Sequence, residues 1–289
     1  MISNITVQTP RTLHEAYELL QKQQGHIKIL AGGTDLMVTL NARVEVHPAY
    51  LNIWPLRELR GISEVGNVIR IGALTTYTQI IRASLVQQHA RILIEAAKSV
   101  GAAQIQNRGT MGGNIVNASP AGDTLPVLAV LEAELEIGSV RGIRKIPFSQ
   151  FYTGYRKTVL AAEELLLAVH VPKPHANDWQ YFRKVGTRQA QAISKVVLAL
   201  FARVDAAKRI EAMRIAYGSV APTVMRTSQT ESLLNGQVLS EVLIQQAQQQ
   251  VMREVQPISD VRSTAEYRRL ISGNILARSL YELLASTLP

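Results

Sequence analysis

The feature that most constrains the fold of this 289-residue chain lies after a proline-rich segment. There, three long strand candidates are followed by two long helix candidates. The segment Pro172-Lys-Pro-His-Ala-Asn177 has the composition of a linker. Beyond it, the patterns predict an antiparallel sheet from residues 179–184, 194–205 and 213–220, and helices over residues 240–255 and 264–284. Strands followed by helices, without strict alternation, favour the α+β class over a doubly wound sheet.

The part before the linker mixes short strands with helices. Strands are expected at residues 5–7, 26–31, 50–53, 68–71, 133–137, 143–146 and 165–171. A helix is expected after Thr12, ending near Gly25, and a short helix or turn over residues 36–40. Residues 75–100 have a helical pattern with a break near Ser84, and a further helix is expected from Asp123 to Leu131.

The composition excludes several chemistries. The chain has no cysteine, so it has no disulfide, no thiolate nucleophile and no cysteine-bound iron–sulfur cluster or zinc. Its six histidines show no metal-binding spacing, and no metal site is expected. The apolar runs are far shorter than the roughly 20 residues of a membrane span. The first residues lack a basic stretch followed by an apolar one, so the expected location is the cytoplasm, away from membranes.

The net charge of +9 lies in the second half of the chain, because residues 141–289 hold 20 of the 31 Lys and Arg and 11 of the 22 Asp and Glu. A basic surface attracts nucleic acid, an anionic cofactor or an acidic protein. The basic residues are scattered and lack interleaved aromatic side chains, so nucleic acid is the least favoured partner. A solvated surface without a partner explains the charge equally well.

Two glycine-centred stretches carry the clearest chemistry, Ala31-Gly-Gly-Thr-Asp35 and Thr110-Met-Gly-Gly-Asn114. Glycine lets a backbone approach a ligand closely and lets successive N–H groups turn toward an anion, so the pair is predicted to hold a diphosphate from both sides. The first stretch lacks the glycine order of a Rossmann turn and the Gly-Lys-Ser/Thr of a Walker loop. A ligand-free turn explains it about equally well, whereas the second stretch carries more polar side chains than a turn needs.

Five motifs in order resemble those of the FAD-binding subunits of molybdenum hydroxylases. They are Lys28–Asp35, Gln106–Asn114, Ala118–Pro126, Gly154–Thr158, and Lys184–Arg188 with Ile193–Lys195. The resemblance extends over essentially the whole chain, and the later motifs are most similar to those of xanthine dehydrogenases.

The resemblance implies an FAD site. Residues that would wrap or grip the diphosphate are Lys28, Ile29, Leu30, Ala31, Gly32, Gly33, Thr34 and Asp35 from one motif and Thr110, Gly112, Gly113 and Asn114 from the other. Asp123 would accept hydrogen bonds from the cofactor, Leu166 would pack near the isoalloxazine, and Lys184 would approach it from the second domain and favour the anionic reduced flavin. Val100 stands where some relatives carry an aromatic residue, and valine cannot stack on the flavin.

The residues alone allow plainer interpretations of the same positions. Asp123 fits a helix N-cap, Lys184 an exposed strand residue, and Leu166 an ordinary core position.

The implied fold is α+β. A two-lobed FAD-binding module of the vanillyl-alcohol-oxidase (PCMH) type would span residues 1–172, with lobes at about 1–55 and 56–172, and a smaller domain of the CO dehydrogenase flavoprotein type would span residues 178–289. The family further implies a small partner subunit with [2Fe–2S] clusters and a large one with molybdopterin. Electrons would leave FAD for NAD or another acceptor, and no catalytic acid or base is expected in this chain.

Several functions stay open beside a xanthine or purine dehydrogenase subunit. The resemblance also fits the FAD subunit of an aldehyde, carbon monoxide or N-heterocycle dehydrogenase. A stand-alone flavoprotein oxidoreductase fits the sequence as well, and so does a non-enzymatic FAD-bearing or interaction protein.

Overall fold

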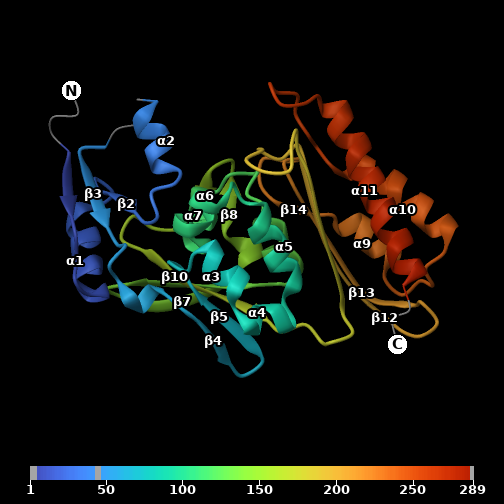
Figure 1. The fold of residues 1–289 in the computed structure, drawn as a ribbon, viewed down its shortest axis with the longest axis horizontal. Helices are drawn as coiled ribbons and strands as arrows, with labels where there is room; N and C mark the ends of the chain where they lie inside the picture. The colour runs from blue at the N-terminus through green and yellow to red at the C-terminus, as the bar shows by residue number, and fades with distance from the viewer. Residues whose placement is uncertain (1–4, 43–46, 287–289) are drawn as a thin grey trace.

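The computed structural model describes residues 5–42 and 47–286, which form three blocks side by side (Figure 1). A small parallel sheet lies at one end, a five-stranded sheet covered by helices lies in the middle, and a four-stranded sheet with its own helices lies at the other end. None of the described helices is long and apolar enough to cross a bilayer.

The first block is a three-stranded parallel sheet in the order β1-β3-β2, packed on helix α1. Its elements are β1 (Thr6–Gln8), α1 (Leu13–Gln23), β2 (Lys28–Leu30), α2 (Leu36–Asn41) and β3 (Ala49–Asn52). Thr12 caps α1 by accepting from the Glu15 N–H, as the sequence predicts, and Gln24 and Gly25 end it with positive φ angles. The first glycine stretch therefore leaves the carboxyl end of β2 and enters α2.

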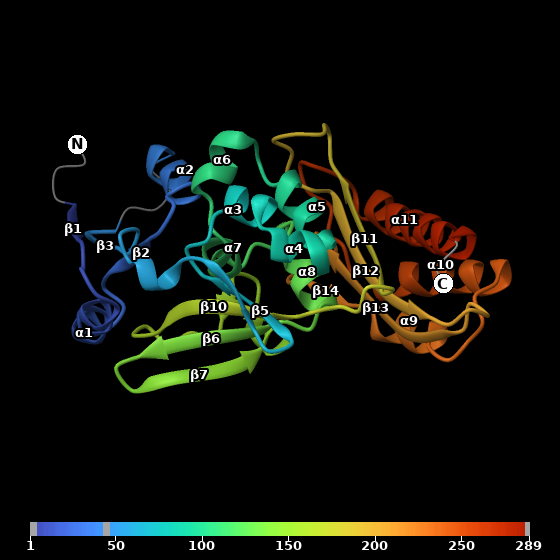
Figure 2. The same cartoon turned by 60° about the horizontal axis from the view of Figure 1, so that its bottom comes forward.

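The middle block is an antiparallel sheet in the order β4-β5-β10-β6-β7. The strands are β4 (Ile62–Val65), β5 (Val68–Gly72), β6 (Glu134–Ser139), β7 (Gly142–Pro147) and β10 (Leu165–Pro172). Helices lie over one face of this sheet (Figure 2), namely α3 (Tyr77–Arg82), α4 (Ser84–His89), α5 (Arg91–Ser99), α6 (Ala103–Arg108), α7 (Met111–Asn117) and α8 (Leu125–Val130). Short elements complete the block: η1 (Arg57–Leu59), η2 (Phe148–Gln150), β8 (Tyr152–Gly154) and β9 (Lys157–Thr158).

The expected break near Ser84 is confirmed at Ala83, and a second break follows at Ala90. The second glycine stretch differs from the expected loop, because residues 111–117 form helix α7. Thr110 is the N-cap, and its hydroxyl accepts from the Gly113 N–H. Capping by this threonine outweighs the low helix propensity of two adjacent glycines.

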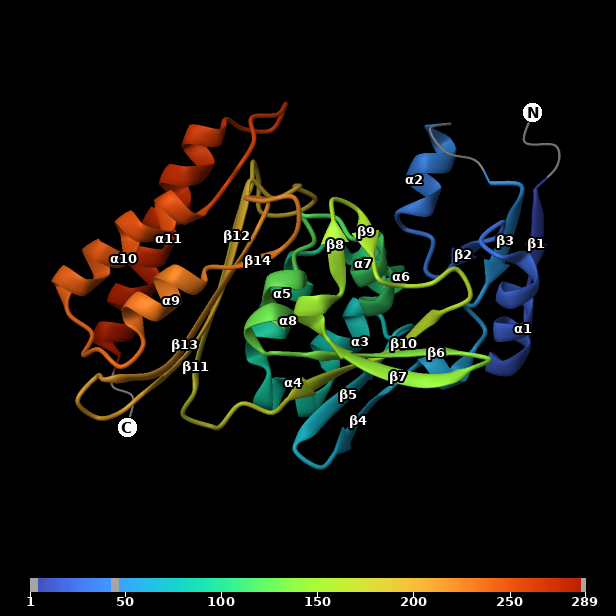
Figure 3. The same cartoon turned by 180° about the vertical axis from the view of Figure 1, so that it is seen from behind.

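The C-terminal sheet is antiparallel, in the order β11-β12-β13-β14. Its elements are β11 (Trp179–Val185), β12 (Val196–Val204), β13 (Ile210–Gly218), β14 (Met225–Arg226), α9 (Ser228–Leu234), α10 (Glu241–Glu254) and α11 (Ala265–Ala285). The sheet stands between α9–α11 on one side and α5 and α8 on the other (Figures 1 and 3).

The side chains of β12 alternate between its two faces, and this explains why the C-terminal sheet lies between two sets of helices. Val196, Leu198 and Leu200 pack in the core under α10 and α11, whereas Ala199 and Phe201 belong to the core of the middle block. The C-terminal sheet thus completes two cores at once, and the α+β architecture expected from the sequence is confirmed.

Candidate cofactor site

The first glycine stretch meets the second motif, Gln106–Asn114, at Gly32. A β-carbon on Gly32 would lie 1.8 Å from the carbonyl oxygen of Arg108, the residue just before Gly109 and the second stretch. The Arg108 Nε–H also donates a long hydrogen bond of 3.4 Å to the Gly32 carbonyl oxygen. Only glycine permits this approach, because any side chain at position 32 would overlap the facing backbone.

The backbone N–H groups of the first stretch are available to a ligand. Those of Gly32, Gly33, Thr34 and Asp35 donate to no acceptor among the described residues. Gly33 has a φ of +79°, a conformation that favours glycine. Successive N–H groups without an internal acceptor form a concavity that suits an anion. Lys28, Ile29 and Leu30 lead into it as β2 and are half-buried, and Ala31 joins the strand to the turn.

The second stretch uses its backbone differently from the expectation. The N–H groups of Met111 and Gly112 donate to the carbonyls of Thr75 and Ala73, at 3.0 and 2.8 Å. Those of Gly113 and Asn114 donate to Thr110, so four successive amides are already bonded within the chain. Because these amides are bonded, a ligand would contact side chains of this stretch. The Asn114 amide oxygen accepts from Thr124 at 2.7 Å, whereas the Asn114 Nδ2 has no partner in the described structure.

Asp123 and Lys184 form a buried ion pair between the middle block and the C-terminal sheet. The Lys184 Nζ lies 2.7 Å from Asp123 Oδ2 and 2.9 Å from the Ser99 carbonyl oxygen, with the Lys184 and Asp123 side chains 9% and 8% exposed. Burial raises the pKa of Asp123 to about 6, although the Lys184 charge lowers it in part. Asp123 is not a helix cap: Thr124 occupies the N-cap position of α8, and no side-chain cap bond forms there.

The second oxygen of Asp123 marks a place for a ligand. Asp123 Oδ1 is buried and has no hydrogen-bond partner among the described residues. A buried acceptor without a donor costs about 1–3 kcal/mol, so this oxygen fits a hydroxyl or amine of a bound molecule. Thr124 connects it to Asn114, which brings Asp123, Lys184 and the second stretch into one region.

Leu166 lies outside this hydrogen-bonded group. It is a core residue of β10, 4% exposed, beside an irregularity in the β10–β6 pairing. Its neighbour Leu167 accepts from the Ala73 N–H, and Ala73 in turn accepts from Gly112, so β10 runs next to the start of α7. Val100 ends helix α5, beside Ser99.

The group implied by the resemblance fits this arrangement. FAD carries an anionic diphosphate, and the first stretch has four N–H donors without acceptors among the described residues. It also carries ribityl and ribose hydroxyls and amine donors, and Asp123 Oδ1 lacks a donor there. Within the described residues no cluster of histidine, aspartate and glutamate is arranged to hold a metal ion.

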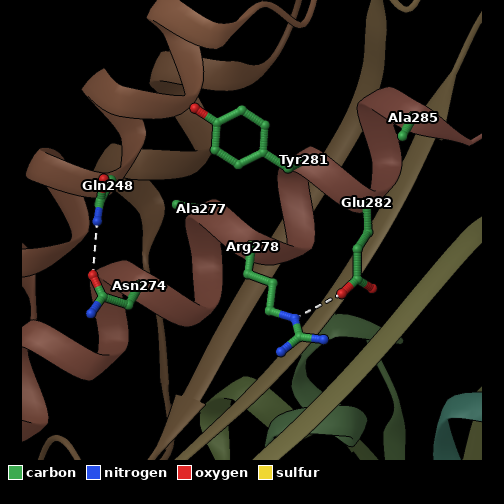
Figure 4. A pocket seen from close by; sticks show the side chains of 7 residues that line it. All are labelled: Gln248, Asn274, Ala277, Arg278, Tyr281, Glu282 and Ala285. Atoms are coloured by element: carbon green, nitrogen blue, oxygen red, sulfur yellow. Dashed lines mark hydrogen bonds and ion pairs between the residues drawn. The ribbon is translucent and has the colours of Figure 1, made fainter.

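Two hollows on the described surface lie away from these residues. One, of about 640 Å³, is an open depression on α10 and α11, where Gln248 bonds Asn274 and Arg278 bonds Glu282, each at 2.9 Å (Figure 4). The other, of about 350 Å³, lies between α4–α5 and β11. Neither is lined by a residue of the predicted FAD site.

Comparison with known proteins agrees with the geometry. Residues 3–174 match the FAD binding domain in molybdopterin dehydrogenase, and residues 180–283 match the CO dehydrogenase flavoprotein C-terminal domain. The chain belongs to the FAD-binding subunits of the molybdopterin dehydrogenases. It is therefore an oxidoreductase subunit with an FAD-binding domain, as the motifs predict.

Relatives of this FAD subunit differ in the substrates that their names give. It is 34% identical to the xanthine dehydrogenase FAD-binding subunit of Escherichia coli O157:H7, over 95% of this chain and 94% of the relative. It is 35% identical to the nicotinate dehydrogenase FAD-subunit of Eubacterium barkeri, over 80% and 79%. Carbon monoxide dehydrogenase from Hydrogenophaga pseudoflava has a chain of the same fold, with a TM-score of 0.92, 28% identity and 95% of each chain covered.

Two residues that contact the predicted site were not singled out from the sequence: Ser99, whose carbonyl oxygen accepts from Lys184, and Arg108, which donates to Gly32. Trp54 in turn contacts Arg108, and Arg60 contacts Trp54. Arg108 lies inside the second motif, so its place in the sequence could have marked it as a site residue. Ser99 acts through its carbonyl and Trp54 through a contact with the distant Arg108, and neither has a local pattern.

Proposed function

We propose that this chain carries FAD as the electron-transfer subunit of a three-subunit molybdenum hydroxylase. The observation that carries the proposal is the meeting of the two glycine motifs at Gly32 and Arg108, 76 residues apart, beside four N–H groups that lack acceptors among the described residues. Such a site suits a dinucleotide diphosphate.

Each part of the chain has a separate task. The first motif, Lys28–Asp35, binds the diphosphate with the N–H groups of residues 32–35, and Thr110 and Asn114 add side-chain contacts. Asp123 accepts from a hydroxyl or amine of the cofactor, and Leu166 supplies an apolar surface. When bound, FAD supplies the redox chemistry by accepting and releasing electrons, so the protein needs no acid–base pair of its own.

Lys184 has a different setting from the one expected of a free positive charge. Asp123 compensates its charge at 2.7 Å, so Lys184 tunes the flavin only as part of a pair. We therefore expect the flavin potential to change little in Lys184→Met if Asp123 protonates when its partner is lost. A large fall in the potential would instead show either that Asp123 stays ionised without its partner or that the lysine charge acts on the flavin directly.

The partner subunits in this proposal are a small [2Fe–2S] protein and a large molybdopterin protein, with NAD or another acceptor taking the electrons. Xanthine or another purine is the proposed substrate class, supported by a xanthine dehydrogenase relative that is similar over nearly the full chain. The nicotinate and carbon monoxide dehydrogenase relatives make those substrates the competing candidates. A cytoplasmic location stays a prediction from the sequence.

Turnover by the purified chain tests the proposal. The FAD-loaded chain alone is expected to oxidise NADH with an artificial acceptor and to leave xanthine unchanged, because hydroxylation belongs to the molybdenum subunit. Hydroxylation of a purine by the isolated chain would contradict the electron-transfer assignment. A well-folded chain that binds no added FAD would contradict the site itself.

Assembly gives a second test. The excess of basic residues after position 140 favours docking of an acidic partner. Complex formation should then weaken with added salt, since exposed charges are screened over about 8 Å at physiological ionic strength. Assembly that is insensitive to salt would point to a mainly apolar interface.

A further inference from the structure

Trp54, which follows β3, is held between two arginines. The guanidinium carbons of Arg60 and Arg108 lie 4.2 and 4.1 Å from the centroid of its ring system. Two such groups cannot share one face at this distance without overlapping, so the indole lies between them. Cation–π attraction stabilises each contact.

This stack brings two positive charges together, with no partner carboxylate in the described part of the chain. No described acidic side chain forms an ion pair with Arg60 or Arg108, and burial together with the charge of Arg108 lowers the pKa of Arg60. Arg60 is further anchored by donating to the Trp54 carbonyl oxygen at 2.6 Å and to that of Leu74 at 3.4 Å. Arg60 therefore braces one face of the indole, and Arg108 covers the other.

Arg108 also determines which way one peptide of the first stretch faces. Its Nε–H donates to the Gly32 carbonyl oxygen. In a trans peptide the C=O and the following N–H point in opposite directions. With its oxygen held by Arg108, the Gly32–Gly33 peptide turns the Gly33 N–H away from Arg108, and that N–H has no acceptor in the described structure. Between two glycines such a peptide rotates easily unless something holds it.

We propose that Arg108 is a positioning residue of the diphosphate site, held in place by Trp54 and braced by Arg60. It fixes the Gly32–Gly33 peptide with the Gly33 N–H directed at the anion. The role depends on the planar guanidinium, which stacks on the indole while its Nε–H points at the carbonyl, whereas a lysine ammonium has no plane with which to make both contacts at once. The inference rests on the proposed FAD function and adds a residue of the second motif that prepares the first glycine stretch for binding.

The test is the dissociation constant of FAD for the full chain, measured by titrating the apoprotein and following flavin fluorescence. Arg108→Lys keeps the charge but loses the planar stack, and is expected to weaken binding by about ten-fold or more. Trp54→Leu should weaken it similarly, whereas Trp54→Phe, which keeps an aromatic face, should restore most of the affinity. The matched control is Arg57→Gln, which removes an exposed charge from the neighbouring η1. Thermal unfolding of each apoprotein checks that the variants are folded.

The outcomes separate this inference from the proposed function. Wild-type affinity in Arg108→Lys, or an equal loss in Arg57→Gln, would mean that positive charge alone matters, and would overturn the positioning role. So would a folded Trp54→Leu that binds within about two-fold of wild type. A wild-type chain that binds no FAD would refute the proposed function itself. If wild type binds FAD and the variants bind it equally well, only the role of Arg108 is refuted.

Discussion

Replacing Asp123 with asparagine is expected to change how the stability of this protein depends on pH. The carboxyl is buried between the two domains, and burial raises its pKa from 3.8 to about 6 despite the ion pair with Lys184. Between about pH 4 and about pH 6, the folded chain therefore holds the Asp123 proton more tightly than the unfolded chain does. The free energy of unfolding contributed by Asp123 therefore falls as the pH rises from about 4 to about 6, by about 3 kcal/mol.

The assay compares wild type with Asp123→Asn, because asparagine does not titrate. Urea unfolding of the full apoprotein chain is measured from about pH 4 to about pH 7 and followed by tryptophan fluorescence. Trp54 reports on the FAD-binding part and Trp179 on the C-terminal sheet, so both sides of the ion pair are observed. The free energy of unfolding of wild type minus that of the variant should fall by about 3 kcal/mol across this range.

Glu164→Gln supplies a control of opposite sign. Its carboxylate accepts two hydrogen bonds of 2.7 Å from Arg144, which hold its pKa below the usual 4.5. A lowered pKa stabilises the fold above the unfolded value, so the difference between wild type and Glu164→Gln should rise with pH through the acid range. If the Asp123→Asn difference stays constant or also rises, attraction by Lys184 outweighs burial, and the reasoning about Asp123 is refuted.

Three further changes test the packing. Gly32→Ala places a β-carbon 1.8 Å from the Arg108 carbonyl oxygen and should abolish measurable FAD binding. The control is Gly154→Ala, whose β-carbon would have its nearest neighbour at 4.0 Å and should leave FAD binding unchanged. Equal FAD affinities of the two variants would contradict the close approach at Gly32. Phe201→Ala should lower the free energy of unfolding by about 3–5 kcal/mol in urea titrations, because Phe201 lies in the core between the domains. A loss of less than about 1 kcal/mol would argue against that shared core. Tyr17→Phe should raise the thermal midpoint or leave it unchanged, because the buried Tyr17 hydroxyl has no partner among described residues; a clear fall would reveal an unrecognised hydrogen bond.

Much of the fold follows from local patterns. The Thr12 cap, the break before Ser84 and the antiparallel strands around 179–220 were all predicted and confirmed. Each depends on residues close in sequence, through capping, periodicity or alternation. Helix α9 was not predicted, because its polar segment Ser228–Leu234 has too short an apolar pattern.

The site was only partly predictable for the opposite reason. The glycine stretches mark where the backbone comes close to something, but local sequence does not say to what. Gly112 is a glycine because Ala73 packs against it, and its N–H is used by Ala73. The expectation of free amides in both stretches therefore holds for the first and not for the second.

The sequence by itself determined the α+β class, the helix boundaries marked by caps and glycines, and the family to which the motifs belong. Tertiary structure alone decided which partners these residues meet: Gly32 with Arg108, Asp123 with Lys184, and Trp54 with two arginines. Backbone preferences are local and can be read from neighbouring residues. Burial and hydrogen-bond partners depend on segments 76 and 61 positions apart, which only the packed chain brings together.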